Sequence, residues 1–164
     1  MNRLDRVLSL ALTCALAAGL AFAGCGGGSS GNAAKGSSGT AGGRPGSKYD
    51  AGPRAGATEA DEARAEKGKS LFSTKGCTAC HAQGRRLTGP DLAGVSMRRT
   101  QIWLEHQILD PATMAQEDPI ARGLMAIHAL QMPKQGLTDE EAKAVIEFFK
   151  QHDQAAGLAP VAAK

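Results

Sequence analysis

Apolar positions in the second half of the chain recur at helical spacing, and no segment shows the alternation that is typical of a half-buried strand. The clearest segment predicts a helix over residues 139–152, which begins at a capping box of Thr138 and Glu141. Its predicted buried residues lie three or four positions apart: Ala142, Val145, Ile146 and Phe149. We therefore predict an all-α fold for this part of the chain.

A longer helix is predicted over residues 59–73, with Thr58 as its N-cap and with Leu71 and Phe72 directed inward. A glycine inside a helix costs about 1 kcal/mol relative to alanine, so the presence of Gly68 in this segment requires an explanation. We expect a second helix to approach the chain closely at this glycine.

Two shorter helices are predicted in the middle of the domain. The first covers residues 101–109, with Thr100 as its N-cap and with Pro111 preventing its extension. Its predicted apolar side consists of Ile102, Trp103 and Leu109. The second runs over residues 119–130, with Asp118 before a proline at the first helical position.

The beginning of the chain has the composition of an export signal. Two arginines precede an apolar run over residues 7–22, and we assign residues 1–24 to a signal peptide. Phe22-Ala23-Gly24-Cys25 resembles the lipobox of bacterial lipoproteins, although that family usually has leucine at the first position. The resemblance predicts a lipid on Cys25, whereas an ordinary cleavage site or an uncleaved anchor helix would leave this cysteine unmodified.

Glycine and small polar residues dominate the next segment, and we predict a flexible tether over residues 25–58. A globular domain over residues 59–153 follows, and residues 154–164 are predicted to be a disordered tail. The globular segment carries 12 Lys and Arg residues against 14 Asp and Glu residues, so its net charge is −2. This balance gives no indication of nucleic-acid binding.

The chemistry of the domain is indicated by the pentapeptide Cys77-Thr78-Ala79-Cys80-His81. Two cysteines at this spacing, followed directly by histidine, are typical of covalent attachment of a c-type haem. A structural zinc site would need a second pair of ligands at matching spacing, and a redox dithiol would follow a strand; the chain shows neither pattern. Haem attachment outside the cytoplasmic membrane also agrees with the predicted signal peptide.

Residues 59–153 resemble a class I, mono-haem cytochrome c. The resemblance rests on the pentapeptide and on further positions: Gly68, Phe72, Gly89-Pro90-Asp91-Leu92, Trp103, Met132-Pro133 and Phe148-Phe149. It implies a cytochrome c fold of about four to five short helices wrapped around one covalently bound haem c. The first and last helices of this fold cross at the glycine.

The resemblance also implies a set of haem contacts. Thioether bonds form at Cys77 and Cys80, and the iron is ligated by His81 and Met132. The carbonyl of Pro90 would orient the proximal imidazole. From the residues alone, other ligands remain open: Met97, Met114, Met125, His106 and His128.

Two features near the expected haem allow more than one interpretation. Trp103 is expected to pack on the haem, and Arg98 to pair with a propionate; the clustered arginines Arg85, Arg86, Arg98 and Arg99 could equally form a basic rim or be solvated. The segment over residues 110–130 departs from the compact family pattern, and we expect it to pack on the domain or to contact a partner.

These features predict an electron carrier and not an enzyme. We expect a monomer held by lipid on Cys25 at an envelope membrane, facing the periplasm or the cell exterior, and exchanging single electrons with a redox donor and acceptor. A haem-based gas-binding or sensing module, and a fixed haem subunit of a larger oxidoreductase, are the alternatives.

Overall fold

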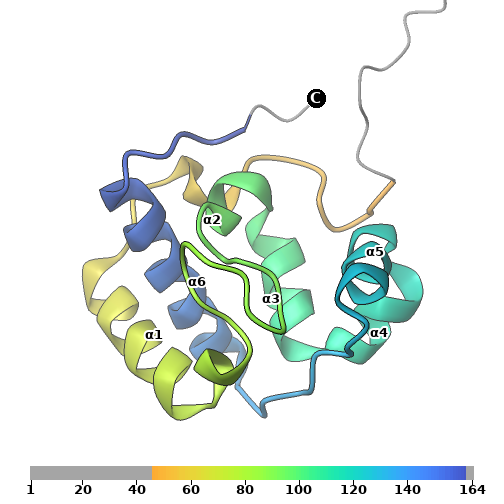
Figure 1. Ribbon diagram of the computed structural model, residues 1–164. Helices are drawn as coiled ribbons and strands as arrows, with labels where there is room; N and C mark the ends of the chain where they lie inside the picture. Colours follow the sequence, from red (N-terminus) through yellow and green to blue (C-terminus); the bar gives the residue numbers. More distant parts are fainter. Residues whose placement is uncertain (1–45, 162–164) are drawn as a thin grey trace, which may run out of the picture. The chain divides into compact units, whose positions relative to one another are not determined.

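The computed structural model describes residues 46–161, and this part of the chain is all-helical (Figure 1). It contains six α-helices and two 3-10 turns, with one isolated bridge and no strand. The elements are η1 (Ala55–Ala57), α1 (Glu62–Thr74), η2 (Cys77–Ala79), α2 (Val95–Arg98), α3 (Gln101–Leu109), α4 (Pro111–Glu117), α5 (Pro119–His128) and α6 (Asp139–Ala155). The all-α prediction is confirmed, with one α-helix more than the four to five expected in the described region.

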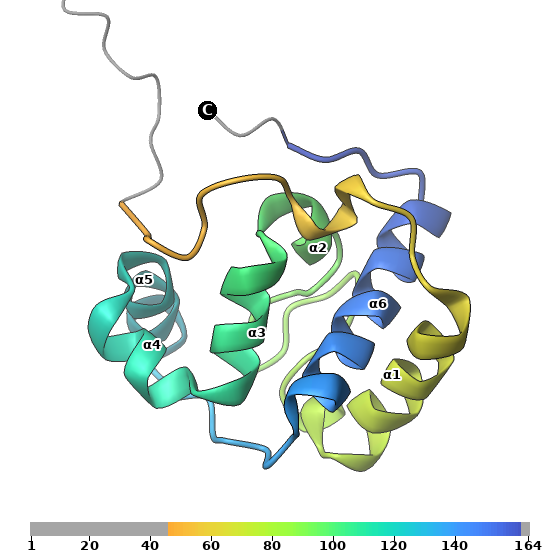
Figure 2. The same cartoon turned by 180° about the vertical axis from the view of Figure 1, so that it is seen from behind.

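The first and last α-helices lie side by side, and α3, α4 and α5 occupy the other half of the domain (Figures 1 and 2). A side chain at Gly68 on α1 would overlap the carbonyl group of Ala144 on α6 and would lie 2.8 Å from the nitrogen of Val145. The expected close approach at this glycine is therefore confirmed. The start of α1 differs from the prediction, because Asp61 accepts from Arg64 N and caps the helix, whereas Thr58 is extended.

The last helix begins where the pattern places it and buries the predicted stripe. Thr138 and Glu141 form both hydrogen bonds of the capping box. Phe149 is 4% exposed and meets Phe72 of α1 with its ring centroid 5.7 Å away, while Phe148 completes a three-ring cluster. This aromatic cluster connects the two crossing helices and forms one side of the core.

Helix α3 has the predicted bounds, but its apolar face is rotated. Thr100 caps it by accepting from Trp103 N at 3.1 Å. Ile102 is 56% exposed, so the expectation that it joins the apolar side is wrong. The buried face is centred on Leu104 and Ile108, which lie one turn apart; Ile102, two residues before Leu104, therefore falls on the opposite side.

Two helices were not predicted. Pro111 ends α3 and is also the first residue of α4, whose N-cap Asp110 accepts from Thr113 N. The short helix α2 lies in a region that glycine and proline indicate as loop, and it follows Gly94 in the left-handed conformation. Helix α5 agrees with the prediction at Asp118 but ends two residues early, at His128.

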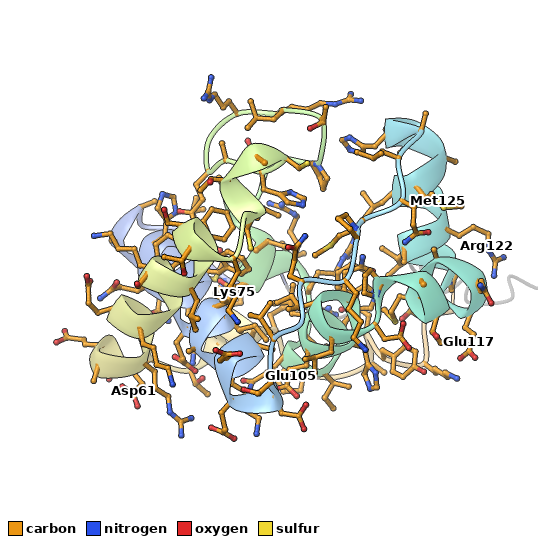
Figure 3. The ribbon with its side chains drawn as sticks, turned by 90° about the horizontal axis from the view of Figure 1, so that it is seen from below. Asp61, Lys75, Glu105, Glu117, Arg122 and Met125 are labelled. Carbon is orange, nitrogen blue, oxygen red and sulfur yellow. The ribbon has the colours of Figure 1, made fainter. Side chains whose placement is uncertain are left out.

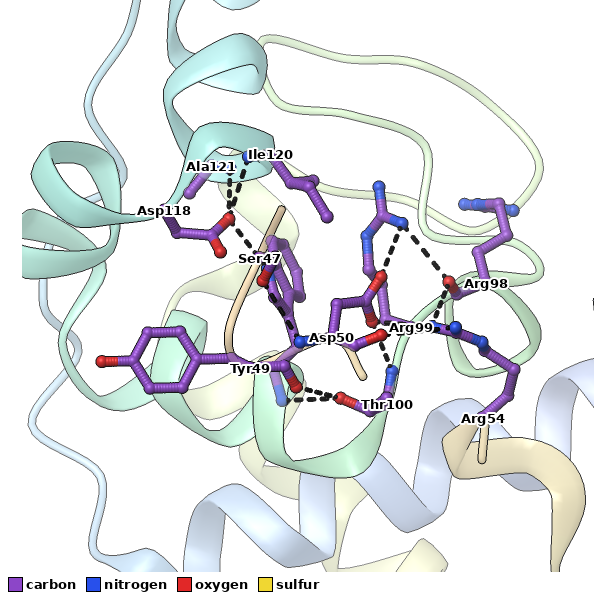
Figure 4. Close-up of polar contacts among 11 residues, drawn as sticks. Ser47, Tyr49, Asp50, Arg54, Arg98, Arg99, Thr100, Asp118, Ile120 and Ala121 are labelled. Carbon is purple, nitrogen blue, oxygen red and sulfur yellow. Dashed lines mark hydrogen bonds and ion pairs between the residues drawn. The ribbon is translucent and has the colours of Figure 1, made fainter. Parts of the chain in front are cut away.

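The folded domain begins earlier than its composition predicts. Asp50 and Arg54 are 7% and 6% exposed and form an ion pair of 2.7 Å (Figure 4). Asp50 also accepts from the backbone of Thr100 at 2.8 Å, and Ala55 N donates to the carbonyl of Arg99 at 2.9 Å. Residues 47–58 are therefore part of the domain, and the predicted tether is wrong over this stretch.

The predicted tail is also ordered as far as it is described. Helix α6 continues to Ala155, and Val161 N donates to the carbonyl of Met97 at 2.9 Å. Asp153, fully buried, accepts from Gly94 N at 2.6 Å and from the Ser96 hydroxyl at 2.7 Å. These contacts hold the end of α6 against α2, so the disordered tail is wrong for residues 154–161.

The predicted signal peptide over residues 1–24 and the lipidation site Cys25 lie outside the described residues. Within residues 46–161, no helix has the length and apolar character needed to cross a membrane.

Candidate functional site

An apolar cavity of about 210 Å³ lies between the two halves of the domain. Four residues singled out from the sequence line it together: Cys77, Cys80, His81 and Met132. The apolar part of its wall comes from several helices and includes Phe72, Leu104, Ile108, Leu124, Val145 and Phe149. Figure 3 places α1, with Asp61 and Lys75 near its two ends, on one side of the molecule and α5, with Met125, on the other.

The two cysteines are positioned by the turn that ends α1. Gly76 adopts the left-handed conformation, with φ of 80°, and directs the chain into η2, which begins at Cys77. Cys77 O accepts from Cys80 N at 3.2 Å and from His81 N at 2.9 Å, so the whole pentapeptide is one compact turn. Both thiols are free and partly buried, and burial raises the pKa of Cys77.

The imidazole of His81 is oriented by a backbone carbonyl. Its Nδ1 lies 3.1 Å from Pro90 O, and because a carbonyl only accepts, Nδ1 carries the proton and Nε2 keeps a free lone pair. Burial lowers the pKa of His81, the Pro90 carbonyl opposes this, and His128 nearby adds to the lowering. The neutral ring is therefore favoured, as a metal ligand requires.

Gly89 makes room for this imidazole. A side chain at Gly89 would lie 2.6 Å from Cε1 and 2.8 Å from Nδ1 of His81, which is closer than real carbon atoms approach. Its amide donates to Cys80 O at 2.9 Å and ties the loop to the pentapeptide. The loop thus serves as a cradle shaped to the His81 ring.

Met132 approaches the cavity from the loop between α5 and α6, and its sulfur lies 3.7 Å from Nε2 of Gln107. The sequence left five alternative iron ligands open, and the structure divides them by whether they line the cavity. Three are absent from the cavity wall: Met97, Met114 and His106. Two line it: Met125 and His128. The Nδ1 atom of His128 lies 2.9 Å from Thr88 O.

Trp103 and Arg98 also line the cavity, each with partners inside the protein. The indole nitrogen of Trp103 donates to Asp118 at 3.0 Å, and Arg98 donates to Ala93 O at 2.6 Å. Of the clustered arginines, Arg99 pairs with Asp50 at 3.4 Å, and Arg86 donates to the carbonyl of Ile127 at 3.4 Å.

The family model for cytochrome c matches residues 65–153. The chain belongs to the cytochrome c family. It is 32% identical over 82 residues to cytochrome c-551 of Ectopseudomonas mendocina, an alignment that covers 49% of this chain and 92% of that protein.

Solved structures of other cytochromes c have the same fold. Cytochrome c from Rhodothermus marinus is 33% identical, with a TM-score of 0.57, over 59% of this chain and 83% of that one. An engineered cytochrome c from the same organism is 32% identical, with a TM-score of 0.56, over 58% of this chain and 83% of that one. The predicted cytochrome c fold is therefore confirmed.

Membership of this family implies a covalently bound haem c and the role of a haem-based electron carrier. The residues of this cytochrome c fit such a group. The cavity wall is largely apolar and includes two free thiols, and Gly89 leaves space for an imidazole with a free lone pair. A thioether and an imidazole are a recognised axial pair for haem iron in electron-transfer proteins.

The segment over residues 110–130 is built into this cytochrome c. It forms α4 and α5, whose buried residues include Met114, Ala115, Ile120 and Ala121. Asp118 joins it to α3 through the Trp103 indole. Packing, one of the two expectations for this segment, is what the structure shows.

Sequence reasoning missed one residue of the cavity wall, Gln107, and the role of one residue that supports the wall, Asp118. Gln107 lines the cavity and contacts the Met132 sulfur. Its position four residues after Trp103 on a predicted helix was a usable signal, because such residues share a face. Asp118 was recognised only as a helix cap, and no local pattern indicates its contact with Trp103, 15 residues earlier.

Proposed function

We propose that this protein is a membrane-tethered, mono-haem cytochrome c that carries single electrons between redox partners in the cell envelope. Cys77 and Cys80 attach the haem, and His81 and Met132 ligate its iron. Cys25 carries the lipid, after removal of residues 1–24 as a signal peptide. The protein acts as a carrier and not as an enzyme.

One observation carries the haem part of this proposal. Both thiols, the imidazole and the thioether line one apolar cavity, although Met132 lies 51 positions after His81 in the chain. This is the complete donor set for covalent attachment and for two axial ligands, and it comes from two separate loops.

The residues around this donor set have separate tasks. Pro90 O holds the His81 ring, which leaves Nε2 available as a ligand. Phe72, Leu104 and Phe149 exclude water from the cavity wall. When bound, the haem supplies an iron that cycles between the ferrous and ferric states. If His81 and Met132 both hold the iron, no position on it would remain for a substrate or a gas.

The first test is an optical spectrum of the haem-loaded protein, oxidised and reduced, with and without carbon monoxide. We expect a weak charge-transfer band from thioether ligation in the ferric form and no change when carbon monoxide is added to the ferrous form. Met132→Ala should keep the covalent haem, lose the band and bind carbon monoxide. Carbon monoxide binding to the unaltered protein would instead favour the gas-binding function.

The tether is tested separately from the haem. The full-length chain and Cys25→Ser should be expressed in a bacterium and fractionated, with haem staining to follow the protein. We expect the unaltered chain in the membrane fraction, released by detergent and labelled when the cells are grown with radioactive palmitate, and the variant without label in whichever fraction it is found. Absence of label from the unaltered chain, or equal labelling of the two, would refute lipidation of Cys25 without affecting the haem assignment.

The redox partners should meet this protein only transiently. Gel filtration of the detergent-solubilised, haem-loaded protein should show a monomer that is not permanently associated with other chains. Stable co-purification with a larger oxidoreductase in fixed proportion would favour the fixed-subunit function instead.

A further inference from the structure

We infer that His128 and Arg86 form a clasp across the haem cavity that keeps Met132 at the iron; this inference rests on the function proposed above. Nδ1 of His128 lies 2.9 Å from Thr88 O. The guanidinium of Arg86 donates to Ile127 O at 3.4 Å. These two hydrogen bonds are the clasp. Breaking it should free the iron position that Met132 occupies for another ligand.

The clasp joins the two segments that carry the proposed iron ligands. One side is the loop over residues 82–90, which holds the His81 ring through a backbone carbonyl. The other side is the last turn of α5, and Met132 follows the end of this helix by four residues. Thr88 and His128 both line the cavity, so the bond between them connects its two walls.

Each bond of the clasp has a defined donor. A carbonyl oxygen only accepts, so Nδ1 of His128 carries a proton and donates to Thr88 O. The carbonyl of Ile127 lies in the last turn of α5, where backbone carbonyls lack a partner within the helix. The cation of Arg86 is also favoured at this end of the helix dipole. The bond from His128 is the shorter, and we expect it to be the stronger of the two.

The residue that follows the clasp is strained. Ala129 has a φ of 51°, and it is the one residue other than glycine with a positive φ in the described part of the chain. This left-handed conformation is unfavourable for alanine, so its relaxation would redirect the chain that leads to Met132. Residues 131–137 form no backbone-to-backbone hydrogen bond with the rest of the described chain, and Gln131 reaches Pro111 O at 3.1 Å. The path of this loop therefore depends on side-chain contacts, and the clasp fixes its starting point against the strain.

Imidazole competes with a thioether for ferric haem iron, and its apparent affinity measures how readily Met132 is displaced. Optical titration of the haem-loaded ferric protein with imidazole at neutral pH gives this affinity. His128→Leu removes the bond to Thr88 O and should raise the affinity about fivefold. Arg86→Leu should raise it about twofold, because its bond is longer and exposed to solvent.

Three control variants separate the clasp from a loss of packing or charge. His128→Asn keeps an N–H at the place of Nδ1 and should have nearly the affinity of the unaltered protein. Arg85→Leu removes the same charge one residue earlier and leaves the clasp in place, so the affinity should not change. Ala129→Gly relieves the strain and should lower the affinity about threefold.

The same His128→Leu substitution in a Met132→Ala protein, whose iron position is already open, tests the coupling directly. A clasp that acts through Met132 should have no effect on imidazole affinity there. An equal rise in both backgrounds would mean that His128 only shields the cavity, and no rise in either would mean that the clasp does not hold Met132; each result would overturn the inference. Equal imidazole affinity of Met132→Ala and the unaltered protein would instead refute Met132 ligation itself, and the inference with it.

Discussion

The crossing of α1 and α6 predicts that one substitution, glycine to alanine, has opposite effects at two positions inside helices. Gly68 lies on α1 against Ala144, whereas Gly123 lies on α5 with no atom within 4 Å of an added Cβ. Gly68→Ala and Gly123→Ala are therefore a matched pair. Both substitutions gain the same helix propensity, and they differ only in the space that is available for the added methyl group.

The expected magnitudes follow from this difference. Alanine favours a helix over glycine by about 1 kcal/mol, so Gly123→Ala should stabilise the domain by about that amount. At Gly68 the new methyl group meets backbone atoms of α6, which cannot rotate away as a side chain can. Forced separation of packed helices costs about 3 kcal/mol, and subtraction of the propensity gain leaves a net loss of about 2 kcal/mol.

Urea unfolding of the haem-loaded variants, followed by far-ultraviolet circular dichroism, measures both changes. Gly68→Ala should shift the unfolding equilibrium by about 30-fold toward the unfolded state, with an unchanged dependence on urea concentration. Equal stabilisation by the two variants would refute the reasoning, because it would mean that α1 and α6 are not in close contact at Gly68.

Three further predictions concern the site and the domain boundary. Gly89→Ala should displace the His81 ring and weaken the ferric iron's ligand field, which the optical spectrum reports. Burial alone would raise the pKa of Asp118, but the Ser47 hydroxyl, the Ala121 amide and the Trp103 indole outweigh it and hold the pKa below 3.8. The ionised Asp118 therefore stabilises the folded state fully above pH 3.8, and this stabilisation is lost as the pH falls through the lowered pKa of the folded state. Asp118→Asn should lower the free energy of unfolding by about 1.5 kcal/mol at neutral pH. Because asparagine does not titrate, the stability of the variant should fall less steeply at acid pH than that of the unaltered protein. An equally steep fall in the two proteins would contradict this. A chain that begins at Glu59 should be at least about 3 kcal/mol less stable to urea than one that begins at Gly46, because it lacks the Asp50 contacts; equal stability would restore the boundary expected from composition.

Local patterns predicted the helix starts that depend on neighbouring residues. The capping box at Thr138 and the cap at Thr100 were both confirmed, because a cap forms within one turn of chain. The haem attachment motif belongs to the same class, since its chemistry lies in five consecutive residues. Asp61 was missed as the cap of α1 because Thr58, three residues earlier, has an equally suitable side chain.

Such local patterns could not predict contacts between segments that lie far apart in the chain. Composition assigned Asp50 and Arg54 to a tether, but both are buried against the start of α3. Asp50 accepts from the amide of Thr100 and pairs with Arg99. Arg54 donates to the carbonyl of Arg98. The α3 sequence places apolar residues on more than one side of the helix, and the tertiary structure buries Leu104 and Ile108 in the core while it leaves Ile102 exposed.

The sequence by itself therefore determined the helical class, the attachment motif and the caps of α3, α5 and α6, since each depends on covalent spacing or on bonds within a single turn. Only the tertiary structure decided which side chains share the cavity with His81. It brought Met132 and Gln107 there from separate elements, excluded Met97 and Met114 from its wall, and extended the domain back to Ser47. These outcomes depend on how helices pack against one another, and packing responds to the whole set of buried surfaces at once.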